Sequence, residues 1–144
     1  MFCYQCEQTT RGTGCTDFAV CGKDESSAVL QDLLIQMAKG VSQYAHRARK
    51  LGAKDPVVDV FIIEALFTTV TNVNFDPLRI QAILNRGVKV RQAARELYEA
   101  AASRSGVAAE VVSGPATWTP ALSIPELVGQ GAAVSLPFRR ERLG

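Results

Sequence analysis

Apolar residues recur every three or four positions from about Ser26 to Leu51, and this spacing predicts a long amphipathic helix. Asp24 or Ser26 can cap its first turn, because both side chains accept hydrogen bonds from backbone N–H groups. Gly52 follows the last turn, where glycine commonly ends a helix. Gly40, inside the helix, indicates close packing against a neighbouring element. The expected core stripe consists of Leu30, Leu33, Leu34, Met37, Val41, Tyr44, Ala48 and Leu51.

Two Asp-Pro pairs predict two further helices, since aspartate is a preferred N-cap and proline suits the first helical position. The first pair opens residues 55–71, which carry a broad apolar face. A strand is a rival for this segment because it is rich in β-branched residues, but its length favours a helix. The second pair, Asp76-Pro77, opens the third helix, which we expect over about 78–103.

The chain loses its helical periodicity after Gly106. Proline interrupts the pattern repeatedly, so we expect irregular structure apart from a short helix that can begin near Pro125. The apolar residues of this tail have few partners in the sequence pattern. We therefore expect the tail to be poorly packed or to cover an interface. The residues concerned are Leu122, Ile124, Leu127, Val128, Val134, Leu136 and Phe138.

These patterns predict a mainly α fold, in which a three-helix bundle follows a cysteine-rich loop and precedes an irregular tail containing proline and glycine. We place the loop at 1–25, the bundle at 26–105 and the tail at 106–144. A chain of 144 residues is long enough to form one domain with a hydrophobic core.

The composition narrows the possible partners and the compartment. The net charge is +2 and the basic residues are spread along the expected helices, so we expect no nucleic-acid partner. No apolar run reaches the roughly 18 residues that span a bilayer, and no signal peptide precedes the first cysteine. We therefore expect a cytoplasmic protein that does not bind a membrane. Cytosolic thiols stay reduced, which favours a metal site over two disulfides.

All four cysteines lie in the first 21 residues, at Cys3, Cys6, Cys15 and Cys21, with the spacing C-x2-C-x8-C-x5-C. Four thiolates can hold an iron–sulfur cluster or a zinc ion, and free thiols or disulfides are a third interpretation. Structural zinc sites use two tight pairs, whereas only the first pair is tight in this chain. The wider spacing favours a cubane iron–sulfur cluster, whose corners lie farther apart than the ligands of one ion.

Glycine and aromatic residues accompany the cysteines. Glycine lets the backbone approach a cluster closely and direct N–H groups at its sulfur atoms. Aromatic side chains can shield a cluster from water and thereby tune its reduction potential. The glycines are Gly12, Gly14 and Gly22, and the aromatic residues are Phe2, Tyr4 and Phe18.

Other residues of types that often catalyse reactions or bind ligands have simpler structural explanations in this chain. His46, the single histidine, lies among Arg and Lys in the first helix and is expected to face solvent. Trp118 is expected to be a packing anchor in the tail. Asn72 and Asn74 are expected to bond backbone groups in the connector between the second and third helices. No serine-based triad, phosphate-binding loop or paired-carboxylate site stands out, so we predict no catalytic residue.

The sequence resembles the hybrid cluster protein family, also called the prismane or hydroxylamine reductase family. The motifs MFCYQCEQT, GTGC and VCGK carry the resemblance at the N-terminus. It continues through LQDLLI at 30–35 and FTTVTNVNFD at 67–76 into the tail, at ATWTP and ELVGQGAAVSLPFRRERLG. These motifs cover most of the chain.

The resemblance implies that Cys3, Cys6, Cys15 and Cys21 bind a [4Fe–4S] cluster and that the matching region is a three-helix bundle. In the family this cluster passes electrons from a donor reductase to a second, iron–sulfur–oxygen cluster. That second cluster reduces hydroxylamine to ammonia and is linked to detoxification of nitric oxide. The resemblance thus predicts an electron-transfer domain of an oxidoreductase.

The chain also departs from the family pattern, because no cysteine follows Cys21 and only one histidine is present. The ligands of the catalytic cluster come from later domains of the family. We therefore expect a truncated family member whose tail leads toward a second bundle, and it is open whether this chain alone is an enzyme. The missing domains can be supplied by a separate chain. The alternatives are a stand-alone iron–sulfur module for redox transfer, nitric oxide sensing or partner binding, and a non-functional gene fragment.

Overall fold

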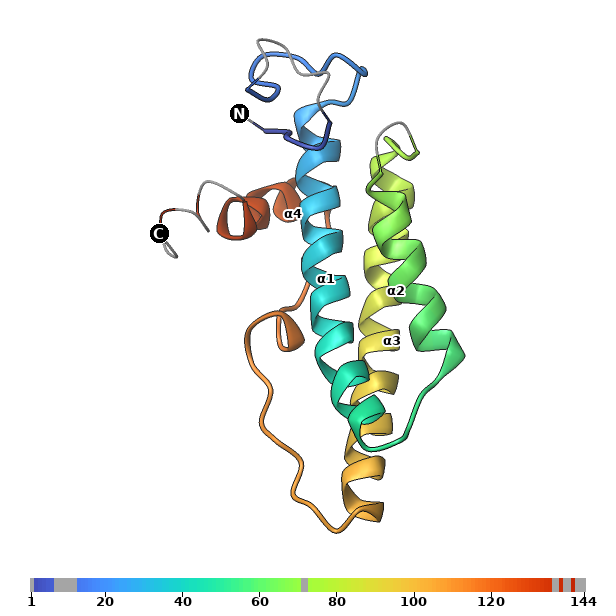
Figure 1. The fold of residues 1–144 in the computed structure, drawn as a ribbon. Coiled ribbons are helices and arrows are strands. Elements are labelled where there is room, and N and C mark those ends of the chain that lie inside the picture. The colour runs from blue at the N-terminus through green and yellow to red at the C-terminus, as the bar shows by residue number, and fades with distance from the viewer. Residues whose placement is uncertain (1, 7–12, 71–72, 136–137, 139–140, 142–144) are drawn as a thin grey trace.

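A computed structural model describes residues 2–6, 13–70, 73–135, 138 and 141. The elements run in the order α1 (Glu25–Lys50), α2 (Pro56–Thr68), α3 (Pro77–Arg104), η1 (Gly114–Ala116), α4 (Ile124–Gly131) and η2 (Ala132–Val134). Figure 1 shows α1, α2 and α3 side by side as a bundle, with α4 on the other side of α1. The described residues contain no strand, and the predicted mainly α fold with a helical bundle is confirmed.

The two ends of α1 follow from local hydrogen bonding. The backbone N–H of Ser27 donates to Oδ1 of Asp24 at 2.6 Å, so Asp24 rather than Ser26 is the N-cap. At the other end, Gly52 adopts a φ of 78°, a left-handed conformation that glycine reaches without strain. Basic side chains occupy the last turn, where they interact favourably with the helix dipole.

Both Asp-Pro pairs open helices as predicted, and the strand alternative for the second segment is wrong. Asp55 accepts from the N–H of Val57 at 2.7 Å, and Asp76 accepts from the N–H of Leu78 at 2.9 Å. The helix α2 ends at Thr68, earlier than the predicted residue 71. The hydroxyl groups of Thr68 and Thr69 donate to carbonyl groups of the last turns and so compete with continued helical bonding.

The core lies where α1 meets α2 and α3. The predicted α1 stripe is buried except for Leu51, which is partly buried just beyond the helix. Side chains from α2 and α3 complete the core, among them Val58, Phe61, Ile80 and Leu84. The helix α2 is apolar on its outer side as well: Val57, Val60, Ile63, Leu66 and Phe67 are exposed.

The predicted close packing at Gly40 is confirmed. A Cβ atom at this position would collide with the backbone carbonyl of Pro115, which belongs to η1. After α3 the chain therefore returns along α1 and touches it directly through backbone atoms (Figure 1). None of the described helices is long and apolar enough to cross a membrane.

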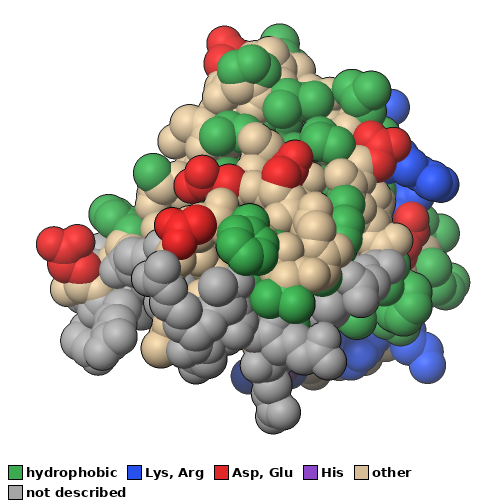
Figure 2. All heavy atoms as spheres, turned by 90° about the horizontal axis from the view of Figure 1, so that it is seen from above, with side chains coloured by type: hydrophobic (Ala, Val, Ile, Leu, Met, Phe, Trp, Pro, Cys, Tyr) green, Lys and Arg blue, Asp and Glu red, His purple; other side chains and the backbone are tan. Residues whose placement is uncertain are grey.

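The end of the bundle that carries the cysteine loop is seen from above in Figure 2. Carboxylate and apolar side chains are interspersed across the described part of this face, and Lys and Arg side chains lie toward its edges. Among the described residues, exposed positive charge therefore does not gather over the middle of this face.

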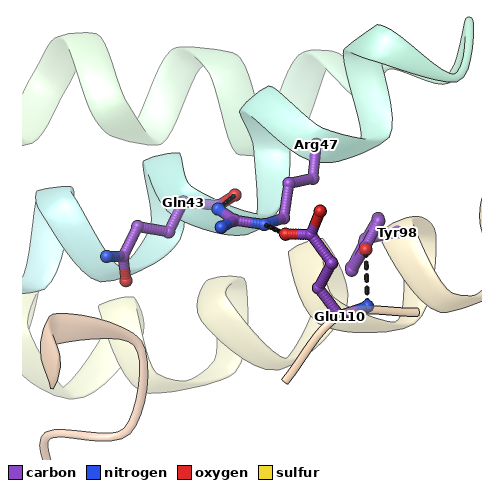
Figure 3. A network of polar contacts seen from close by, with 4 residues as sticks. All are labelled: Gln43, Arg47, Tyr98 and Glu110. Atoms are coloured by element: carbon purple, nitrogen blue, oxygen red, sulfur yellow. Dashed lines mark hydrogen bonds and ion pairs between the residues drawn. The ribbon is translucent and has the colours of Figure 1, made fainter. Parts of the chain in front are cut away.

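Polar contacts hold the returning chain against α1 and α3 (Figure 3). The backbone N–H of Glu110 donates to the hydroxyl of Tyr98 at 2.8 Å, and its carboxylate pairs with Nε of Arg47 at 2.8 Å. Farther along, the N–H of Ala116 donates to Oε1 of Gln43 at 3.1 Å. The bonds to Arg47 and Gln43 join the tail to residues of α1 that are more than 60 positions away in the sequence.

The tail is better packed than the sequence pattern predicts. Leu127 is fully buried and Val134 nearly so, because α4 packs against α1 at the small residue Gly131, which lies against Val29. The expectation of poor packing is therefore wrong for these two residues. The expectation of poor packing agrees better with Leu122, whose side chain is 88% exposed. Leu136 lies outside the described residues. The short helix expected near Pro125 is present as α4.

The packing role predicted for Trp118 is confirmed, since its side chain lies against the main core. Its carbonyl accepts a hydrogen bond from the guanidinium of Arg91, which also donates to the carbonyl of Pro115 at 3.4 Å. Burial lowers the pKa of Arg91, and the effect is partly offset by the nearby Tyr44. Arg91 of α3 thus bonds to the tail at Pro115, the same residue whose carbonyl packs against Gly40 of α1.

Candidate metal centre

Backbone pairing brings the first and third cysteines side by side. Residues Cys3 and Cys15 form an antiparallel bridge next to the N-terminal end of α1 (Figure 1). The N–H of Phe2 donates to the carbonyl of Cys15 at 2.9 Å, and the N–H of Cys15 donates to the carbonyl of Cys3 at 2.9 Å. The bridge thus closes a loop whose residues 7–12 lie outside the described part of the chain.

A small apolar cluster encloses these two thiols. Cys3 is 8% exposed and Cys15 is 3% exposed, and both belong to one buried cluster with Ala19 of the loop and Ala28 of α1. Cys21 packs against this cluster, and Cys6 is also partly buried. The structure therefore brings three of the four predicted ligands into one cluster.

The residues beside the cysteines partly match their predicted roles. Gly14 has a φ of 114° and Gly22 a φ of 84°, so both turn the chain in the left-handed region next to a cysteine. Gly12 lies outside the described residues. Phe2 packs against the cysteine cluster as a shield would, whereas Phe18 is 63% exposed.

A buried lysine, which the sequence analysis did not identify, is part of the loop. Lys23 is 2% exposed, and its ammonium group lies 4.0 Å from Sγ of Cys3. It donates to Oε1 of Gln5 at 2.5 Å and to Oε1 of Gln31 at 2.6 Å, and it lies 5.5 Å from the centroid of the Phe75 ring. Lys23 therefore joins the cysteine loop, α1 and the connector between α2 and α3.

The connector itself is tied to the first turns of α1. Nε2 of Gln31 donates to the carbonyl of Asn74 at 2.7 Å, and the hydroxyl of Ser27 donates to the carbonyl of Phe75 at 3.0 Å. The side chain of Asn74 accepts from the N–H of Asp76 at 2.9 Å, which confirms its predicted backbone role. Asn72 lies outside the described residues. These bonds fix Gln31, and through it the position of the Lys23 ammonium.

The donor set of the loop suits a soft metal centre. Cysteine thiolates are the ligands that iron–sulfur clusters and zinc prefer, and a nearby ammonium offsets their negative charge. Among the described residues, no group of three or more His, Cys, Asp or Glu side chains converges closely enough to hold one metal ion. The fit therefore rests on the thiol chemistry, on the Cys3–Cys15 pairing and on Lys23. His46 is exposed, as predicted, and lies near the C-terminal end of α1, whereas the cysteine loop lies at the N-terminal end.

Fold and loop together define a helical protein with a cysteine-rich loop at its N-terminus. The sequence profile of the Prismane/CO dehydrogenase family matches residues 1–132, and the chain belongs to this family.

Curated relatives with high identity share one name. The chain is similar to hydroxylamine reductase of Rhodospirillum rubrum, with 49% identity over 96% of this chain and 25% of the relative. It is 47% identical to hydroxylamine reductase of Acidithiobacillus ferrooxidans, over 100% of this chain and 27% of the relative. The enzyme of that name from Geobacter sulfurreducens is 46% identical over 91% of this chain and 24% of its own length. The chain thus spans about a quarter of the length of the relatives it matches.

Proposed function

We propose that this chain is the electron-transfer domain of a hydroxylamine-reductase-type enzyme and that Cys3, Cys6, Cys15 and Cys21 bind a [4Fe–4S] cluster. Membership of the family and the name of its relatives support the enzyme class. One observation supports the site above all: a backbone bridge holds Cys3 and Cys15 side by side, and Cys21 packs against the cluster to which both belong.

When bound, a cubane cluster held by four thiolates supplies one-electron transfer. The chain's own residues prepare its surroundings. The side chains of Phe2, Ala19 and Ala28 exclude water from the cysteine pair. The ammonium of Lys23 is held beside Cys3 and provides positive charge where the thiolates concentrate negative charge.

Reduction of hydroxylamine to ammonia and water is proposed for the whole enzyme, of which this chain corresponds to about a quarter. In this proposal the chain accepts single electrons from a cytoplasmic reductase and passes them to the catalytic part of the enzyme. The cysteine loop at the end of the bundle is the point of entry.

Anaerobic reconstitution of the 144-residue chain with ferrous iron and sulfide tests the site. We expect about four iron and four sulfide per chain, as a cubane cluster requires, and an EPR signal that develops on reduction. Purified protein that holds one zinc, takes up no sulfide and gives no such signal would contradict the proposal. Reversible cycling under reductant supports electron transfer, whereas irreversible loss of the cluster on exposure to nitric oxide favours a sensing module.

A further inference from the structure

Lys23 is an unusual residue because its charge is buried without a charged partner among the described residues. The residue is 2% exposed, and the hydrogen-bond acceptors of its ammonium group there are the amide oxygens of Gln5 and Gln31 and the sulfur of Cys3. Burial of an ammonium is costly unless an opposite charge or several good acceptors compensate for the lost water. Two amides and a ring face compensate only in part.

The arrangement holds the ammonium at the cysteines rather than letting it reach water. Lysine side chains are long and flexible, and they usually extend their charged end to the surface. Here two amide oxygens from different segments hold the ammonium, and the bond from Gln31 to Asn74 fixes one of them. The ammonium therefore points to the thiol of Cys3 because the surrounding residues keep it there.

We infer that Lys23 is a positioning residue that places a fixed positive charge beside the four-cysteine site and thereby raises the reduction potential of a cluster bound there. The inference rests on the proposed function. A cluster gains one negative charge when it accepts an electron, and a nearby cation stabilises the more negative state.

A purely structural role for Lys23 makes a different prediction. As a tie between the loop, α1 and the connector, the lysine would stabilise the protein to the same degree with and without a cluster. As a charge partner, it is unfavourable or neutral in the cluster-free protein and stabilising in the loaded protein, because only the loaded protein supplies the opposite charge.

The test compares Lys23→Met, which removes the charge, with Lys23→Arg, which keeps it. Lys54→Met is the matched control, since Lys54 is exposed and lies in the turn between α1 and α2, at the other end of the bundle (Figure 1). Each variant is reconstituted with ferrous iron and sulfide, and its potential is measured by EPR-monitored redox titration. Thermal unfolding is measured before and after reconstitution.

We expect K23M to shift the electron equilibrium tenfold or more against reduction, a fall of about 59 mV or more for one electron. K23R and K54M should keep the wild-type potential. K23M should unfold at the wild-type temperature or above without a cluster, and below it when loaded. If K23M does not load, unchanged cluster-free stability together with normal loading of K23R supports the inference.

Two results would overturn it. One is a loaded K23M with the wild-type potential. The other is a K23M whose cluster-free form is less stable than the cluster-free wild type. That result would mark Lys23 as a structural residue, whether or not the loaded form loses stability equally. A wild-type chain that takes up neither iron nor sulfide refutes the proposed function itself and is thereby distinguished from a failure of the inference.

Discussion

The helical bundle and the cysteine loop bury their side chains against different partners. In the bundle, Leu30 and Leu34 of α1 and Ile80 of α3 are fully buried against large apolar neighbours from three helices. In the loop, the buried cluster consists of small residues, Cys3, Cys15, Ala19 and Ala28. Burial of small side chains contributes little free energy, because the hydrophobic effect scales with the apolar area removed from water.

This difference indicates that the cysteine loop, rather than the bundle, needs a bound ligand for its stability. The bundle has its own core and helix caps, so its fold follows from its side chains. The loop has one backbone bridge, a small cluster and a buried ammonium, and a metal centre would supply the energy that its core lacks. The predictions below test whether changes in one region leave the other unaffected.

The largest effect is expected from Cys15→Ser, a change confined to the loop. Cys15 is 3% exposed and pairs with Cys3, so its loss removes a predicted ligand from the centre of the site. We expect C15S to lose bound iron and sulfide entirely while its far-UV circular dichroism stays that of the wild type. Thr13→Ser, at an exposed position in the same loop, should load normally. Full loading of C15S would refute the ligand assignment, and loss of its helices would show that loop and bundle are not independent.

A smaller but still large effect is expected from Leu34→Ala in the bundle. Leu34 is fully buried, and such a truncation leaves a cavity that lowers the free energy of unfolding by about 2–5 kcal/mol. Urea denaturation of the cluster-free chain measures this loss. Ile63→Ala is the control, because Ile63 is 68% exposed and its truncation should change stability by about 0.5 kcal/mol or less. Equal losses in the two variants would contradict the described core.

Gly40→Ala should cost less, since alanine is more favourable than glycine inside a helix and offsets part of the strain. The new Cβ atom would collide with the carbonyl of Pro115, and overpacking of this kind costs about 1–3 kcal/mol. Gly129→Ala, in a helix position with nothing near the added atom, should instead stabilise the chain by about 0.4–1 kcal/mol. Denaturant midpoints of the two variants should therefore move in opposite directions. A stabilised G40A would show that the tail does not pack on α1 as described.

The smallest effect is expected from Asp24→Ala, at the junction of the two regions. The change removes the N-cap of α1 and should lower the free energy of unfolding by about 1 kcal/mol. Asp24→Asn should keep most of the stability, because asparagine caps a helix equally well. Thermal unfolding of the three proteins compares them directly. Equal destabilisation of both variants would indicate that the charge of Asp24, rather than its cap, is what matters.

Much of the bundle is predictable from the sequence because its signals are local. The three-and-four spacing in α1 and the Asp-Pro pairs before α2 and α3 depend on neighbouring residues only. The packing of the tail is not predictable in this way. Leu127 is buried because α4 lies against α1, where Gly131 meets Val29 about 100 residues earlier in the chain, and a proline-rich sequence gives no sign of that contact.

The candidate site divides similarly. The four cysteines and their spacing are visible in the sequence, and so are the two glycines that turn the chain beside them. The burial of Lys23 is not, because lysine is among the residues that are least often buried. Its environment comes from Gln5 and Gln31, which only the folded chain brings together. The position of Lys23 directly after Cys21-Gly22, in the VCGK motif, was the only sequence feature that pointed to a role at the site. Without the contacts to Gln5 and Gln31, that feature does not predict burial.

The most direct test of the central claim is a redox titration, followed by EPR, of the reconstituted wild-type chain beside C15S. The account predicts a single one-electron transition in the wild type, from a cluster with about four iron and four sulfide, and no transition in C15S. A wild-type chain that shows no transition, or a C15S variant that shows the same one, would contradict the claim that the four cysteines hold an electron-transferring cluster.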